Sequence, residues 1–194
     1  MEIGKTLYLT KRSEWRKWLS IHRKTETEIW LIYYKKNSDK PRISYNDAVE
    51  EALCFGWIDS ILKPINKDCY VQRFSPRRKN SPLSEMNKER VRRLIKAKKM
   101  TKYGMEMIKH HLDAKTNKIV YKRKLNNFKL PDDILKELKT DSVVWKNFKK
   151  FSDSYKRIRI GWIDASRNRP EFFRTRLNYF IRMTAKNKKF GMVQ

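Results

Sequence analysis

An aromatic residue, a carboxylate, a hydroxyl, an amide and arginines gather between Trp57 and Arg77. Side chains of these types form small-anion sites, because guanidinium groups bind carboxylate or phosphate through paired hydrogen bonds and aromatic faces stack on planar ligands. The sequence therefore predicts a ligand pocket in this stretch. The candidate pocket residues are Trp57, Asp59, Ser60, Tyr70, Gln72, Arg73 and Arg77.

The same residues also fit a purely structural interpretation. In that case Trp57 is a core aromatic residue, and Asp59 forms an ion pair with Arg73 across two strands. Ser60 and Gln72 are then polar residues at a strand edge. Both interpretations stay open, because the sequence does not fix the register of the two strands.

A helix and a hairpin are expected to position the pocket residues. Ser44 has the form of an N-cap, and apolar residues at helical spacing predict a helix over residues 44–55 that ends at Gly56. The alternating pattern that follows predicts two strands joined by a turn at residues 64–68. Alternation would place Asp59 on the same face of its strand as Trp57.

The remaining pattern predicts an α+β N-terminal domain with a small mixed or antiparallel sheet, followed by an all-helical C-terminal region. Ser13 is expected to cap a first helix with a tryptophan-rich face. The nearly continuous apolar run at residues 29–34 is typical of a central strand. The expected boundaries are an α+β domain at 1–115, a linker at 116–129 and a helical module at 130–194.

Charge is the strongest global signal in the 194 residues, with 48 Lys and Arg against 21 Asp and Glu and a net charge of +27. Residues 65–125 hold 19 of the basic side chains and five of the acidic ones. A field of this sign attracts polyanions such as nucleic acid, although a generally lysine-rich composition would also account for it. The candidate polyanion contacts are Arg78, Lys79, Lys88, Arg92, Lys96 and Lys99.

The residue types do not indicate metal binding, cofactor binding or catalysis. Cys54 and Cys69 do not stand in a metal-ligand pattern, and the side chains of adjacent His110 and His111 would diverge by about 100° on a helix. We therefore expect no metal, no cofactor and no catalytic residue. No apolar run reaches the length of a membrane span, so the expected location is the cytoplasm.

Two segments resemble the bacteriocin-protection, YdeI/OmpD-associated family. The first runs from Ile43 to Ser60 and continues with Tyr70 and residues 72–77, and the second joins Trp162–Ala165 to Arg169–Glu171. The resemblance implies an α+β domain followed by a small helical region. It also implies a role in resistance to toxic peptides or to envelope stress, with no established catalytic mechanism.

These observations favour a non-catalytic binding protein over an enzyme. Its basic surface is expected to bind polyanions, with nucleic acid as the leading partner. The alternative is a small-anion-binding protein or an enzyme with a pocket around Trp57, Asp59 and Arg73.

Overall fold

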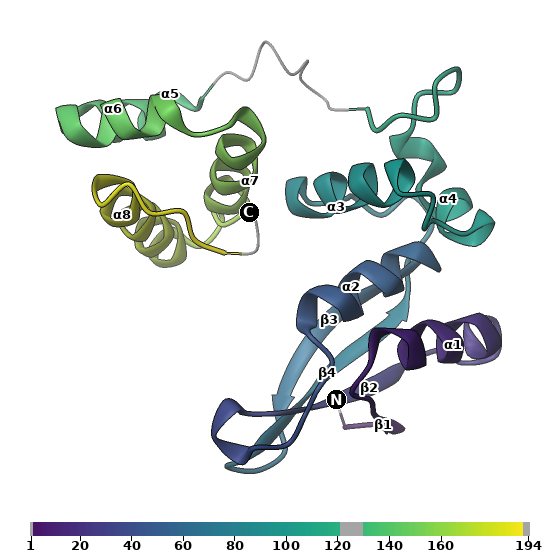
Figure 1. Ribbon diagram of the computed structural model, residues 1–194. Helices are drawn as coiled ribbons and strands as arrows, with labels where there is room; N and C mark the ends of the chain where they lie inside the picture. Colours follow the sequence, from purple (N-terminus) through teal and green to yellow (C-terminus); the bar gives the residue numbers. More distant parts are fainter. Residues whose placement is uncertain (1, 121–129, 192–194) are drawn as a thin grey trace. The chain divides into compact units, whose positions relative to one another are not determined.

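The computed structural model describes residues 2–120 and 130–191 (Figure 1). The chain forms two compact units. The first comprises residues 1–82 and 90–120, and the second comprises residues 83–89 and 121–194. The linker predicted at 116–129 lies mostly outside the described residues.

The first unit is built on a four-stranded mixed sheet. Its strands are β1 (Thr6–Tyr8), β2 (Ile29–Tyr34), β3 (Trp57–Pro64) and β4 (Cys69–Pro76). The strand order is β1-β2-β4-β3, with β1 parallel to β2 and the other neighbours antiparallel. Together with the helices described below, this sheet confirms the predicted α+β class.

Strand β2 lies in the interior of the sheet, as its apolar run predicts. Ile29, Trp30, Leu31 and Tyr33 are each at most 1% exposed. A strand covered on both faces cannot alternate between apolar and polar residues, because both sets of side chains are withdrawn from water.

Helices α1 (Arg12–His22) and α2 (Tyr45–Cys54) pack on the face of the sheet that carries Phe74 and Trp57 (Figure 1). Trp15 of α1 donates its indole N–H to the carbonyl of Ala48 in α2 at 3.0 Å. The ring of Trp15 also contacts that of Phe74, with 5.5 Å between their centroids. One buried tryptophan thus joins both helices to the sheet, and its polar atom is satisfied.

The start of α1 differs from the prediction. The N-cap is Lys11 and not Ser13. The carboxylate of Glu14 accepts hydrogen bonds from the backbone N–H groups of Thr10 and Lys11, each at 3.1 Å. A glutamate at the third helical position reaches back to the backbone N–H of the N-cap, which is one half of a capping box, and it also interacts favourably with the helix dipole.

Helix α2 begins and ends as its sequence predicts. The Ser44 hydroxyl accepts a hydrogen bond from the backbone N–H of Asp47 at 3.0 Å. Gly56 follows the helix with φ of +76°, a conformation that favours glycine. The chain can therefore turn directly from α2 into β3.

Two further helices follow the hairpin, α3 (Glu85–Lys96) and α4 (Lys102–Ile108), and the first residues of α3, up to Glu89, belong to the second unit. Thr101 caps α4, and its hydroxyl donates to the carbonyl of Cys54 at the end of α2. Single 3-10 turns lie at Lys36–Ser38 and Lys109–His111.

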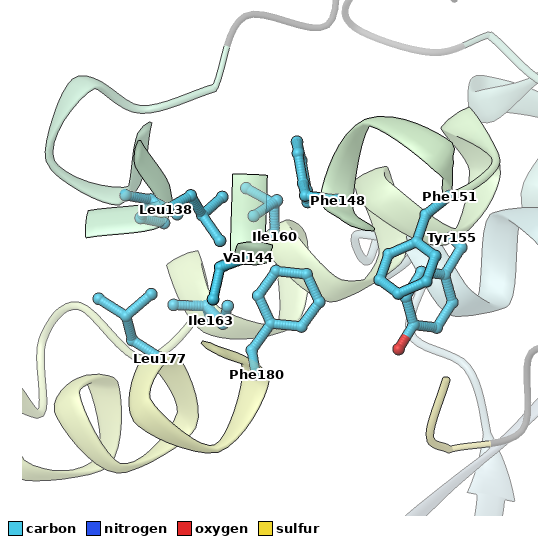
Figure 2. Packing of buried hydrophobic residues seen from close by; sticks show 10 residues of the cluster. Leu138, Val144, Phe148, Phe151, Tyr155, Ile160, Ile163, Leu177 and Phe180 are labelled. Atoms are coloured by element: carbon cyan, nitrogen blue, oxygen red, sulfur yellow. The ribbon is translucent and has the colours of Figure 1, made fainter. Parts of the chain in front are cut away.

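The second unit contains the four C-terminal helices. These are α5 (Asp132–Lys139), α6 (Ser142–Lys150), α7 (Asp153–Asp164) and α8 (Pro170–Ala185). Their apolar faces meet in one core, in which Val144, Phe148 and Phe180 are at most 2% exposed (Figure 2). The predicted helical character of the C-terminal region is confirmed.

Candidate functional site

The register of the β3–β4 hairpin places Asp59 and Arg73 on opposite faces of the sheet. Asp59 is paired with Phe74, whose side chain packs against Trp15 beneath the helices. Arg73 is the neighbour of Phe74 in the same strand, so its side chain points to the other face. The predicted ion pair between Asp59 and Arg73 therefore does not form.

Arg73 instead belongs to a network on the face away from the helices. Its Nε donates to the carboxylate of Glu28 at 2.7 Å. Its Nη1 lies 3.3 Å from the Ser60 hydroxyl and 3.4 Å from the Ser75 hydroxyl. The guanidinium of Arg73 is thus held by a carboxylate and by two hydroxyls of the same sheet.

Asp59 is engaged by the first residue of α2. The hydroxyl of Tyr45 donates to Asp59 Oδ2 at 2.6 Å. Burial, followed by this hydrogen bond and the charge of Asp59, raises the pKa of Tyr45 well above its ordinary value. The next residue of α2, Asn46, accepts from Arg90 Nη2 at 2.9 Å. An aryl hydroxyl, a carboxylate and a guanidinium therefore gather at the N-terminal end of α2.

Two stacked tyrosines continue this group along the sheet. The rings of Tyr33 and Tyr70 lie 5.4 Å apart with an angle of 8° between their planes, and the Tyr70 hydroxyl accepts from Arg42 Nη1 at 3.2 Å. The Tyr33 hydroxyl is buried and has no hydrogen-bond partner in residues 2–120 and 130–191. Burial raises the pKa of Tyr33, and the nearby Tyr70, Tyr45 and Asp59 raise it further.

Gln72 has a structural role within the hairpin. A β-bulge interrupts the register between Asp59 and Leu62, and the Gln72 side-chain amide donates to the carbonyl of Ile61 at 3.3 Å. Bulges leave a backbone group outside the regular ladder. The buried amide of Gln72 satisfies that carbonyl, so Gln72 is not directed at a ligand.

Arg77 anchors the turn that follows the hairpin. Its Nη2 contacts the Ser81 hydroxyl at 3.0 Å and the carbonyls of Pro82 and Ser81 at 2.9 and 3.3 Å. The side chain is nearly inaccessible to solvent, with the residue 4% exposed. Burial lowers the pKa of Arg77, whereas the charge of Asp59 acts in the opposite direction. The buried Arg77 guanidinium therefore holds the turn at residues 81–82 in place.

The same loop is approached by both adjacent histidines. His110 Nε2 and His111 Nε2 lie 3.3 and 3.0 Å from the carbonyl oxygen of Ser81, with 3.9 Å between the ring centroids. The prediction that the two rings diverge is wrong, because both rings turn toward the Ser81 carbonyl from one 3-10 turn. No group of three His, Cys, Asp or Glu side chains in the described residues is arranged to hold a metal ion.

Trp57 and the two cysteines belong to the interior. Trp57 is 1% exposed, and its ring contacts that of Trp18 with 5.8 Å between centroids. Cys54 and Cys69 are buried free thiols. Burial raises the pKa of Cys54 to about 11. A thiol with this environment is a poor nucleophile at neutral pH.

The seven predicted pocket residues therefore belong to separate environments. Asp59 and Tyr70 lie with the α2 N-terminus, Arg73 and Ser60 lie on the other face, and the rest contact the core, the bulge or the 81–82 turn. Tyr45 and Arg42 were missed as members of the Asp59 group. A tyrosine directly after the N-cap Ser44 was the available sequence signal for Tyr45, and the structure shows this residue to be 36% exposed.

The predicted basic residues differ in accessibility. Arg78, Lys79, Arg92, Lys96 and Lys99 are exposed. Lys88 differs from the other candidate polyanion contacts, because it is 7% exposed and forms an ion pair with Glu85 at 2.5 Å. The exposed candidates of this region therefore lie in the C-terminal half of α3 and in the residues after it.

Comparison with known families assigns the two parts of the chain to different domains. Residues 7–107, just over half of the chain, match the family described as domain of unknown function (DUF8412), and the protein belongs to that family. Residues 127–187 match the bacteriocin-protection, YdeI or OmpD-associated domain. The predicted family is thus confirmed over the C-terminal part, whereas the N-terminal run that also resembled it lies within the other match.

Neither the curated proteins nor the solved structures include a match to this chain. Within residues 2–120 and 130–191, no helix has the length and apolar composition needed to cross a membrane. The comparisons thus give a family without a described reaction, and function has to be argued from the side chains.

Proposed function

We propose that the protein is a non-catalytic binding module that holds nucleic acid through a cationic surface on the first unit. This surface, called the α3 cationic surface below, consists of Arg92, Lys96, Lys98 and Lys99. Arg92 and Lys96 have the spacing i and i+4, which puts them on one side of α3, and Lys98 and Lys99 follow just after its last residue. All four residues are exposed.

The observation that carries the proposal is the absence of neutralising carboxylates at these lysines. Residues 90–102 include no Asp or Glu. In the described part of the chain, the ammonium groups of Lys96, Lys98 and Lys99 form no ion pair, while Arg93 reaches Glu50 at 3.8 Å. Lysines without an ion-pair partner attract phosphates and release counterions when they bind.

A structural role for the same lysines makes a different prediction. Cations near the C-terminal end of a helix stabilise it through the helix dipole by about 0.3–1 kcal/mol each. If that were their only role, charge reversal at Lys96 and Lys99 would lower the free energy of unfolding and leave binding unchanged. Binding and stability measured on the same variants therefore separate the two roles.

The test is fluorescence anisotropy of a labelled single-stranded oligonucleotide across a salt series. For Lys96→Glu/Lys99→Glu we expect weaker binding and a slope of log K against log salt that is shallower by about 1.4, since each phosphate contact with a single strand contributes about 0.7. The control is Lys186→Glu/Lys188→Glu, which changes the net charge equally at two exposed residues of the second unit. Equal weakening by both variants would refute a specific surface and assign the binding to total charge.

A further inference from the structure

An open hollow lies beside the C-terminal end of α1, the turn between α2 and β3, and helix α4. Its volume is about 190 Å³. Phe55, Trp57, Pro76, Tyr103 and Met107 form its apolar walls. These are aromatic rings, a proline ring and a thioether, which are the groups that make favourable contacts with the face of a planar ligand.

The backbone leaves this space because a glycine lines it. Gly56 also lines the hollow, and its φ is +76°. A Cβ atom at this position would lie 2.6 Å from Met107 Cγ, so no other residue fits without displacing the wall. The turn that ends α2 and the approach of α4 therefore shape the hollow together.

Cations surround the aromatic wall. The guanidinium carbon of Arg23 lies 3.7 Å from the centroid of the Tyr103 ring, and the ammonium groups of Lys24 and Lys102 lie 5.5 and 5.3 Å from it. Arg23 and Lys24 line the hollow themselves, as does Glu106. The carboxylate of Glu106 is paired with Lys109 at 2.5 Å. The rim is therefore positive overall, and it favours a ligand that carries negative charge next to a planar apolar group.

The size of the hollow restricts that ligand further. Pockets that enclose whole small-molecule ligands measure about 300–1,000 Å³, and this one is smaller. A hollow of this size suits a ligand that inserts one ring system and keeps its charged groups outside. A nucleotide within a strand has this form, because its base is planar and its phosphates lie on either side along the backbone.

We propose that this hollow receives one unpaired base of a single-stranded nucleic acid, with the flanking phosphates on Arg23, Lys24 and Lys102. The inference rests on the proposed nucleic-acid binding and adds that the protein prefers single-stranded over duplex nucleic acid. Bases in a duplex are stacked and paired, so inserting one of them costs unstacking and unpairing energy that an unpaired strand does not lose, and a single strand is preferred. Arg23 already lies 3.7 Å over one face of the Tyr103 ring, so the Arg23–Tyr103 pair together supplies the stacking surface for the base.

The hollow lies close to the α3 cationic surface along the chain. Lys102 directly precedes Tyr103, and Lys99 stands four residues before it. Consecutive Cα atoms are separated by about 3.8 Å, so the Cα atoms of Lys99 and Tyr103 lie within about 15 Å of each other. A bound strand can therefore contact the cationic surface and the hollow at the same time.

The test compares two labelled ligands with equal numbers of phosphates, a thymidine 12-mer and an abasic deoxyribose-phosphate 12-mer, by anisotropy on the full chain. We expect the wild-type protein to bind the thymidine oligomer about 10-fold more tightly, because stacking of one base on an aromatic side chain contributes about this much. Tyr103→Ala should abolish the preference, and Tyr103→Phe should keep it. Lys96→Glu/Lys99→Glu should weaken both ligands by the same factor.

A second readout guards against misfolding of Tyr103→Ala. Trp57 lines the hollow, so saturating thymidine oligomer should quench tryptophan emission of the wild-type protein, whereas the abasic oligomer should not. Equal wild-type affinity for both ligands, or the same quenching by both, would overturn the base site and leave the proposed function standing. Binding of neither ligand at physiological salt would overturn the proposed function and the base site together.

Discussion

Glu51 offers the sharpest test of how helices α1 and α2 are held together. Its carboxylate is 2% exposed and accepts hydrogen bonds from Arg12 Nε and Arg16 Nη1, both at 2.6 Å. Burial disfavours the charged form of Arg12, yet the hydrogen bonds and charges of Glu51, Glu50 and Asp47 outweigh it and raise the pKa of Arg12. The three carboxylates therefore favour the charged form of Arg12 despite its partial burial.

The variant Glu51→Gln keeps the size of the side chain and removes its charge. Breaking a buried ion pair by removing one partner costs about 3–5 kcal/mol. The two arginine side chains are 28% and 40% exposed, so water compensates for part of the loss. We therefore expect the free energy of unfolding of the first unit to fall by about 2–3 kcal/mol.

Urea unfolding followed by tryptophan emission measures this change, since four of the six tryptophans, Trp15, Trp18, Trp30 and Trp57, belong to the first unit and only Trp145 and Trp162 to the second. The matched control is Glu50→Gln, in the same turn of α2. Its carboxylate lies 3.0 Å from Arg12 and 3.8 Å from Arg93, and its side chain is 19% exposed. We expect this control to lose less than about 1 kcal/mol. If Glu51→Gln were no more destabilising than Glu50→Gln, the argument from burial would be refuted.

Two further predictions concern the junction between α2 and α4. Gly104→Ala should lower the free energy of unfolding by about 3 kcal/mol, because the new Cβ would lie 2.2 Å from the carbonyl oxygen of Cys54. Thermal denaturation measures this loss, with Gly161→Ala as the control. The free energy of unfolding of Gly161→Ala should stay within about 1 kcal/mol of the wild-type value, since the nearest atom to the new Cβ, at 3.0 Å, belongs to the flexible side chain of Glu85. The pKa of about 11 for Cys54 leaves roughly one thiolate in a thousand at pH 8. Mass spectrometry should therefore find Cys54 unmodified by iodoacetamide in the native protein and modified in urea, and equal labelling in both would contradict its burial.

Local signals in the sequence were sufficient to predict much of the secondary structure. The apolar run at 29–34 identified a strand with both faces covered, and Ser44 and Gly56 marked the two ends of α2 through their capping chemistry. Each of these signals depends on neighbouring residues alone. The α1 cap was missed because Glu14, three residues after Lys11, took the role assigned to Ser13.

Contacts between distant residues could not be predicted in this way. Arg73 could have paired with any carboxylate on its face, and Glu28 is brought beside it only by the pairing of β2 with β4. Lys88 has the same sequence spacing as the exposed cations of α3, yet it is buried. Helical periodicity says which residues share a side, but packing decides which sides meet water.

The β-bulge in β3 shows most clearly why the candidate site was the hardest part to predict. Before the bulge Asp59 is paired with Phe74, and after it Leu62 is paired with Gln72, so one extra residue has entered β3. Because strand side chains alternate with a period of two, an inserted residue moves every later side chain to the opposite face. Alternation counted from Trp57 therefore holds through Asp59 and fails beyond Ser60. The residue that stabilises the bulge, Gln72, lies on the partner strand, so the change of face is encoded in the contact between two strands and in neither strand alone.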